Sequence, residues 1–377
     1  MTGMIKHGLV LSGGGARGAY QAGVLQGVAE IATELGLEQP FKIITGVSAG
    51  AVNASYLASC SDSFQQATDK LVESWSKIKA EDVFKTDAVT AGRLGFKFAL
   101  DAAIGAMYKK KLARSLLDTS PLKGYLEGNT DFSAIEKNLA SGHIDALAIT
   151  AMNYTNSHSL TFVQSLKEVK MWDRSRRKSV ISKIGVEHVM ASGAIPLFFP
   201  PVRIDEDHYG DGCLRNTAPL SPAIHLGANR LLVVGVRRPD HLAPTIQAHI
   251  EPSLARVLGV VLNALLMDAV EFDMERLGRI NQTVEMIPFE MRQHLQLKKI
   301  EYLWIRPSQD IGQIASQLFD RLPRVLRYLV SGLGSQKEAS ELTSYLLFDP
   351  EFCSEIARLG RADATSQRDE IERFLRV

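Results

Sequence analysis

The chain has 377 residues and a formal net charge of +1, with 43 Lys and Arg against 42 Asp and Glu. This length can bury a large core, and it accommodates one α/β domain with a helical extension as well as two domains. The balanced charge argues against a nucleic-acid-binding protein, which usually carries a basic excess. Three widely spaced cysteines, Cys60, Cys213 and Cys353, form no metal-binding pattern and suit a reducing compartment.

Targeting and membrane signals are weak in this sequence. The first seven residues hold no apolar signal core. The longest uncharged run, residues 43–61, approaches the length of a membrane span but contains too many Gly, Ser and Asn residues for one. We therefore expect a cytoplasmic protein, and we expect no metal and no cofactor.

The first elements in chain order alternate between strand and helix. Residues 7–12 predict a buried strand that ends in the glycine loop 13–18, and residues 19–35 have apolar side chains at helical spacing. The short apolar run 41–44 predicts a second strand, and residues 51–58 predict a second helix. This order indicates an α/β fold that begins with a right-handed crossover.

The turn between the second strand and its helix is Thr45-Gly46-Val47-Ser48-Ala49-Gly50. A strand, a G-x-S-x-G turn and a helix together form a nucleophile elbow, which lifts a serine oxygen out of the chain. Gly46 and Gly50 fit this geometry because a side chain at either position would collide with the neighbouring strand and helix. The alternative is a tight turn that holds an ordinary serine.

The later elements are predicted as follows. Residues 64–78 and 131–139 predict helices, 144–151 and 160–164 a pair of strands, and 230–236 a buried parallel strand.

Residues 92–117 are apolar and end in a lysine cluster; they either pack on the core, or cover a site or touch a membrane surface transiently. Residues 254–270 predict a core helix, with the wall of an acyl-chain site as the alternative. We place a catalytic domain at 1–245 and a mainly helical region at 246–377, with a late strand near 300–305, packed on the catalytic domain.

The glycine loop, Gly13-Gly14-Gly15-Ala16-Arg17-Gly18, has two interpretations. It fits the dinucleotide fingerprint G-x-G-x-x-G, but that motif requires an acidic residue after the second strand, where this chain has the elbow. The backbone N–H groups of a glycine loop before a helix also bind anions, including the oxyanion that forms when a serine attacks an ester. The adjacent elbow favours the second interpretation.

A nucleophilic serine needs a base. The nine histidines are scattered and form no recognisable triad motif, although one sequence does not exclude a histidine base. Asp211, between Gly210 and Gly212, is the best carboxylate, with an ordinary turn aspartate as the alternative. A free Asp is a weak base, so this role requires a dry site that raises its pKa by about two units above ~3.9.

Four blocks in this order resemble the patatin-like phospholipase family. They are the glycine loop, the elbow, the segment 191–196 (Ala-Ser-Gly-Ala-Ile-Pro) with the Phe-Phe-Pro-Pro run that follows it, and the Asp211-Gly212 pair. The resemblance spans about residues 7–236. It departs at Cys213, where the family usually has Gly or Ala.

The resemblance implies a three-layer α/β/α fold with a mostly parallel central sheet. It further implies that Ser48 is the nucleophile, Asp211 is the general base, and the N–H groups of Gly13, Gly14 and Gly15 form the oxyanion hole. Arg17 matches the family's basic position and, with Gly18, braces the loop. The expected function is a serine lipid acyl hydrolase of the phospholipase A or lysophospholipase type. The alternatives are a catalytically silent lipid-binding regulator and a dinucleotide-binding oxidoreductase.

Overall fold

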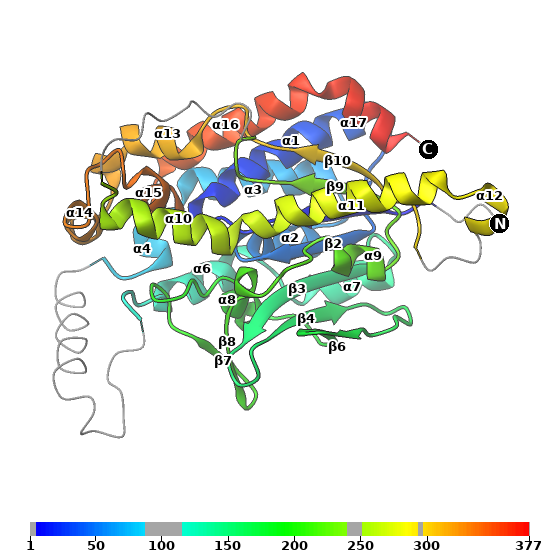
Figure 1. Ribbon diagram of the computed structural model, residues 1–377, viewed down its shortest axis with the longest axis horizontal. Coiled ribbons are helices and arrows are strands. Elements are labelled where there is room, and N and C mark those ends of the chain that lie inside the picture. Colours follow the sequence, from blue (N-terminus) through cyan, green and yellow to red (C-terminus); the bar gives the residue numbers. More distant parts are fainter. Residues whose placement is uncertain (1–4, 87–114, 240–250, 293–296, 377) are drawn as a thin grey trace.

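A computed structural model describes residues 5–86, 115–239, 251–292 and 297–376 (Figure 1). Its centre is a ten-stranded sheet in the order β10-β9-β1-β2-β3-β4-β6-β5, with β7 paired to β8 and β8 paired to β3. The strands are β1 (His7–Leu11), β2 (Ile43–Val47), β3 (Ala146–Asn153), β4 (His158–Gln164), β5 (Asp173–Arg174), β6 (Arg177–Ile181), β7 (Val202–Ile204), β8 (Asp207–Asp211), β9 (Arg230–Val234) and β10 (Glu301–Ile305).

The five strands β10, β9, β1, β2 and β3 run parallel to one another. Every residue of β1, β2 and β3 is buried. Burial on both faces is the usual state of parallel strands, and it explains why these strands are short continuous apolar runs rather than alternating ones.

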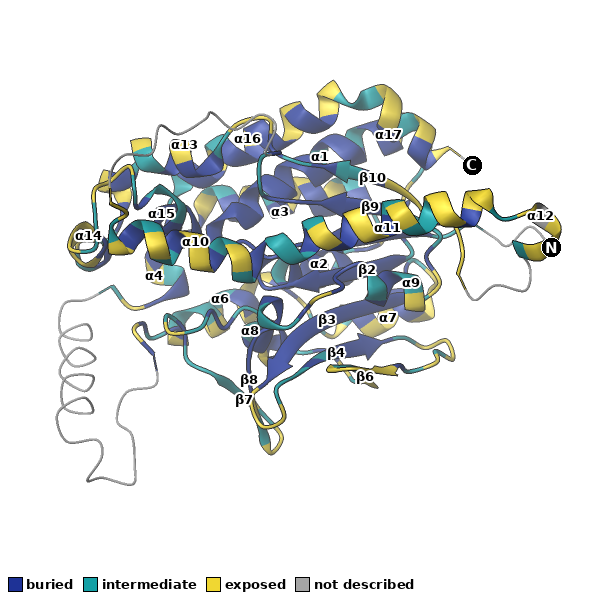
Figure 2. Ribbon diagram, in the orientation of Figure 1, coloured by how far each residue is buried: buried dark blue, intermediate teal, exposed yellow. Residues whose placement is uncertain are grey.

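Helices cover both faces of the sheet. Successive side chains of β1 point to opposite faces, and those on each face pack against helices. Leu9 and Leu11 pack with one set of helices, and Val10 packs with another. The first set includes α1 (Gly18–Glu34), α2 (Ala49–Ser59), α3 (Phe64–Lys77) and α16 (Pro350–Ser366), and the second consists of α9 (Ser221–His225) and α11 (Asp268–Met286). The protein therefore has the predicted three-layer α/β/α fold (Figures 1 and 2).

The remaining helices lie around this framework (Figure 1). They are α4 (Ala80–Val83), α6 (Ser120–Asn129), α7 (Ala134–Ala140), α8 (Val186–Ser192), α10 (Leu254–Leu266), α12 (Phe289–Arg292), α13 (Ile311–Gln317), α14 (Arg324–Ser331), α15 (Ser340–Leu346) and α17 (Arg368–Leu375). No helix in the described ranges is both long enough and apolar enough to cross a bilayer.

One prediction needs correction. The core helix predicted over 254–270 is two helices, because the backbone leaves helical geometry at Met267 between α10 and α11. α10 is also not a core helix, since Figure 2 shows it with both buried and exposed parts. Ala255 and Leu262 are buried, whereas Val257 and Val260 are exposed. An apolar sequence alone does not reveal which side of a helix will find a partner.

The C-terminal region packs closely against the first part of the chain. β10 extends the sheet beside β9, and α16 lies along α1. A Cβ atom on Gly23 would lie 1.8 Å from the carbonyl oxygen of Ala357, and one on Gly360 would lie 2.2 Å from that of Tyr20. The two helices approach this closely because glycines stand at the contact. The predicted cover or membrane contact at 92–117 falls almost wholly outside the described residues, which resume at Ser115.

Candidate active site

The elbow lies where β2 meets α2. Ser48 has φ 54° and ψ −126°, a left-handed conformation that a non-glycine residue rarely adopts. A Cβ atom on Gly46 would lie 2.2 Å from the Gly50 carbonyl oxygen, and one on Gly50 would lie 2.2 Å from the Leu11 carbonyl oxygen. Both glycines are therefore required by the tight approach of strand and helix.

Ser192, at the C-terminal end of α8, links the elbow to β3 through hydrogen bonds. The backbone N–H of Ser48 donates to Ser192 Oγ at 2.9 Å, and that hydroxyl donates to the carbonyl oxygen of Thr150 at 2.7 Å. Ser192 is fully buried. In the sequence, its segment, 191–196, stood out only as one of the four blocks of the resemblance, and this side chain was not singled out.

Asp211 lies next to Ser48 because β2 and β8 both pair with β3. β2 lies beside β3 and ends at Val47, which pairs with Thr150. β8 then approaches the same strand from the opposite direction and ends at Asp211, which pairs with Ala151, the next residue of β3. The ends of β2 and β8 thus face each other beside β3, and this brings Asp211 next to Ser48.

The Asp211 carboxyl group is fully buried. Its Oδ1 accepts a hydrogen bond from the backbone N–H of Cys213 at 2.9 Å, whereas its buried Oδ2 has no well-aligned donor. Burial raises the pKa of Asp211 to about 6, although contact with the Ser48 hydroxyl and the Cys213 N–H partly opposes this rise. The Ser48 hydroxyl is therefore close enough to act on this carboxylate electrostatically without being aligned as a donor.

No described histidine hydrogen-bonds to Ser48 or Asp211. The buried His188, for example, is bound to Ser182 and to the Gly185 N–H, and His7 faces the carbonyl oxygen of Phe374. Among the described residues, Asp211 rather than a histidine is thus the ionisable group that interacts with the Ser48 hydroxyl.

The glycine loop passes directly beside Ser48. A Cβ atom on Gly13 would lie 3.1 Å from Ser48 Cβ and 2.5 Å from Cys213 Sγ. Gly15 has φ 58°, in the left-handed region that favours glycine. Within the described residues, the N–H groups of Gly13, Gly14 and Gly15 donate to no backbone carbonyl, although the Gly13 N–H interacts with the Cys213 sulfur. The loop continues into a short 3-10 helix, Gly15–Arg17, and then into α1.

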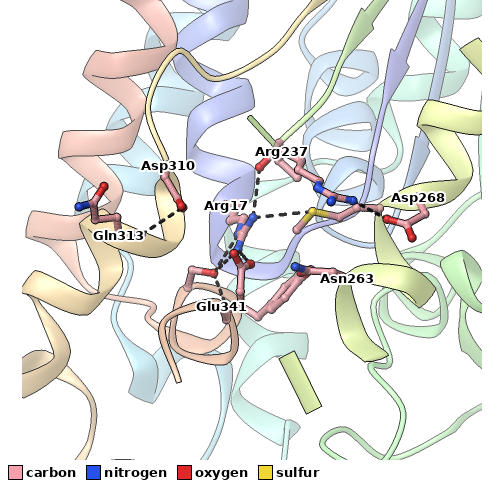
Figure 3. Close-up of polar contacts among 11 residues, drawn as sticks. Arg17, Arg237, Asn263, Asp268, Asp310, Gln313 and Glu341 are labelled. Atoms are coloured by element: carbon pink, nitrogen blue, oxygen red, sulfur yellow. Dashed lines mark hydrogen bonds and ion pairs between the residues drawn. The ribbon is translucent and has the colours of Figure 1, made fainter. Parts of the chain in front are cut away.

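The last two residues of the loop, Arg17 and Gly18, contact other parts of the fold. Arg17 is buried and extends towards α15, where it binds Glu341 and Ser344 (Figure 3). Gly18 provides room for Trp75, since a Cβ atom there would lie 2.7 Å from the indole ring. The contacts of Arg17 are thus with α15 and those of Gly18 with α3.

An apolar cavity with a volume of about 70 Å³ opens from Ser48. Its walls come from α2, α3 and the segment after α8, and they include Val52, Tyr56, Leu71, Trp75, Ile195 and Phe199. A larger cleft of about 420 Å³ is polar, does not reach Ser48 and is lined by charged residues such as Lys79, Arg321 and Glu351. The chemistry of the site favours the smaller cavity as the binding site for an apolar group. The described residues contain no group of three or more His, Cys, Asp or Glu side chains arranged to hold a metal ion.

Comparison with known proteins identifies a family for this sequence. A model of the patatin-like phospholipase family matches residues 9–224, more than half of the chain. This match contains Gly13–Gly18, Ser48, Ser192 and Asp211. A search of curated protein sequences found no match.

Solved structures with detectable similarity include VipD from Legionella pneumophila (16% identity, TM-score 0.34), the type III effector ExoU of Pseudomonas aeruginosa (14%, 0.37) and human GIVD cytosolic phospholipase A2 in complex with methyl gamma-linolenyl fluorophosphonate (12%, 0.42). The alignments cover 91%, 98% and 98% of this chain and 67%, 53% and 59% of those chains. The chain thus spans between about half and two thirds of their length. These superpositions are loose, and the family assignment rests on the sequence match.

Proposed function

This chain belongs to the patatin-like phospholipase family, and we propose that it is a serine lipid acyl hydrolase of the phospholipase A or lysophospholipase type. One observation carries the proposal: β2 and β8 end face to face beside β3, which puts the buried Asp211 carboxylate against the Ser48 hydroxyl. We assign residues 1–245 to the catalytic domain and 246–377 to a helical region packed on it.

In the proposed reaction, Ser48 Oγ attacks the carbonyl carbon of an acyl ester while Asp211 Oδ2 takes the hydroxyl proton. The ester bond then breaks, the alcohol leaves with that proton, and the acyl group remains on Ser48. Water attacks the acyl-enzyme with Asp211 again as the base, and the fatty acid is released. The raised pKa of Asp211, about 6, makes it a far better base than an exposed carboxylate.

The glycine loop is the proposed oxyanion hole. Gly13 lies beside Ser48, and Gly15 lines the same cavity as Ser48. The loop leads into the N-terminus of α1, where the helix dipole also favours negative charge. One well-placed donor of this kind is worth about a hundred- to thousandfold in rate.

The apolar cavity supports a lipid substrate. Its walls offer hydrocarbon contacts but few polar groups, so it would accommodate part of an acyl chain whose ester carbon reaches Ser48. We place the enzyme in the cytoplasm, consistent with its unpaired cysteines, and we propose that it meets its substrate at the surface of membranes.

The test combines labelling with lipid profiling. Purified protein is treated with a fluorophosphonate probe and incubated with a panel of phospholipids and lysophospholipids, and free fatty acid is measured. Ser48→Ala should remove both labelling and hydrolysis, whereas Ser55→Ala, which changes another buried serine of α2, should retain both. A folded wild-type protein that binds lipid but is neither labelled nor active would favour the silent lipid-binding alternative. Tight binding of NAD or NADP without labelling would favour the dinucleotide alternative.

Asp211→Asn tests the base. It should abolish hydrolysis while leaving the fold intact. Full activity in this variant would show that a histidine, not Asp211, accepts the proton.

A further inference from the structure

Arg17 ties the glycine loop to a helix outside the part of the chain that matches the family model. Its guanidinium donates through Nη2 to Glu341 Oε2 at 2.5 Å and to Ser344 Oγ at 2.6 Å, and through Nε to the same serine oxygen at 2.9 Å. Glu341 and Ser344 both belong to α15, more than one hundred residues beyond the matched range 9–224. Figure 3 shows the Arg17 and Glu341 side chains pointing toward each other.

This contact is an ion pair with little access to water. Arg17 is only 3% exposed. Burial by itself would raise the pKa of Glu341, but the Arg17 charge and hydrogen bond outweigh it and hold the pKa below its usual value. The guanidinium also lies 4.8 Å from the centre of the Tyr345 ring. A buried arginine with these partners has one well-defined position, and removing one partner leaves an uncompensated charge.

α15 also contacts the loop through the backbone. A Cβ atom on Gly15 would lie 2.3 Å from the carbonyl oxygen of Tyr345, so the loop passes directly over the end of this helix. The Tyr345 hydroxyl donates to Asn263 Oδ1 of α10 at 2.7 Å, which fixes α15 in turn. The loop is thus held on one side by Ser48 and Cys213, and on the other by α15.

We propose that Glu341 and Ser344 are positioning residues for the oxyanion hole, acting through Arg17. They hold the guanidinium, and the guanidinium holds the turn from which the N–H groups of Gly13, Gly14 and Gly15 project. The site is therefore incomplete without the C-terminal region, whose role in the reaction is to keep these donors aimed at the developing oxyanion. This inference rests on the proposed function, because it assigns a purpose to the same loop.

A misaligned oxyanion donor and a weakened substrate site change different kinetic constants. An oxyanion donor acts on the transition state rather than on the bound ester, so a displaced donor lowers kcat and leaves KM largely unchanged. Glu341→Gln keeps the size of the side chain and one oxygen acceptor but removes the charge that opposes Arg17. Ser344→Ala removes the hydroxyl that accepts two of the Arg17 hydrogen bonds, and it is the milder change for folding.

The experiment measures kcat, KM and amide hydrogen exchange of residues 13–18 in the full-length variants. We expect Glu341→Gln to lower kcat about 10- to 100-fold, less than the loss of a donor altogether, with KM changed less than about threefold and faster exchange in the glycine loop. Ser344→Ala should shift both readouts in the same direction by a smaller factor. The control is Asp273→Asn, which alters another buried, ion-paired carboxylate of the C-terminal region, bound to Arg276 and the Leu220 N–H; it should change neither readout.

The outcomes separate the two claims. If both α15 variants keep wild-type kcat and wild-type exchange in the loop, the positioning role is wrong while the hydrolase remains. If Asp273→Asn lowers kcat as much as Glu341→Gln does, the effect is a general loss of stability and the positioning role is also wrong. If the wild-type protein hydrolyses no lipid ester, the proposed function fails, and the exchange data alone then decide whether α15 orders the loop.

Discussion

Replacing Asp211 by Asn should make the protein inactive and at the same time more stable. The side chain is fully buried, so its environment penalises the ionised form. In the variant, the amide oxygen can keep the hydrogen bond from the Cys213 N–H that Oδ1 now accepts at 2.9 Å. The amide nitrogen would take the place of Oδ2, which has no aligned donor, and would face the Ser48 hydroxyl as a donor.

The magnitude follows from the pKa of Asp211, which burial raises from 3.8 to about 6. A raised carboxyl pKa means that the folded protein retains the proton which the unfolded chain has already released. This group therefore contributes its full stability below about pH 4 and loses it as the pH rises through about 6. At about 1.4 kcal/mol per pKa unit, the ionised carboxylate lowers the free energy of unfolding by about 3 kcal/mol at pH 8 and by about 1.5 kcal/mol at pH 5.

Equilibrium denaturation of the wild type and of Asp211→Asn, at several values between pH 5 and pH 8, measures this effect. The neutral amide does not titrate, so the stability advantage of the variant should grow by about 1.5 kcal/mol across the range. The growth with pH, rather than the absolute difference, is the decisive quantity because it cancels any fixed cost of the substitution. A difference that stays constant, or that shrinks towards pH 8, would refute a raised pKa at this position and with it the idea of a buried carboxylate tuned as a base.

Three further expectations concern the same site. If ionised Asp211 is the base, kcat/KM should fall about tenfold per pH unit below about pH 6; a profile that stays level to pH 5 would exclude this. Gly13→Ala should reduce activity severely, since its Cβ would lie 2.5 Å from Cys213 Sγ, and adding Cys213→Ala should restore part of it; an equally inactive double variant would show that this clash is not the cause. Ser192→Ala leaves the Ser48 N–H without its partner, so the free energy of unfolding should fall by about 1–3 kcal/mol, and an unchanged denaturation midpoint would contradict the proposed support of the elbow.

Features that depend on a few neighbouring residues could be predicted from the sequence. The strand β1, the loop that follows it and the helix α1 lie where apolar runs, glycines and helical spacing indicated them. The elbow at Ser48 was predictable for the same reason: Gly46 and Gly50 are needed to pass a helix so close to the strands.

Other features could not be predicted from the sequence. β7 and β8 are short, and their alternation is weak, so no strand was predicted before Asp211. The surface position of α10 was missed because its sequence is apolar on nearly every side, and only its contacts show which side is covered. The small residues Gly23 and Gly360, which allow α1 and α16 to touch, are 337 positions apart, and nothing local connects them.

The sequence by itself determined the local chemistry: a serine on a strained turn, a glycine loop before a helix, and an aspartate between glycines. Only the tertiary structure decided how these parts meet, through the ends of β2 and β8 beside β3 and through the hold of α15 on Arg17. The physical reason is that backbone strain and glycine requirements are properties of adjacent residues. The burial that raises the pKa of Asp211, and the partners that hold Arg17, come from segments far apart in the chain and exist only once the core has packed.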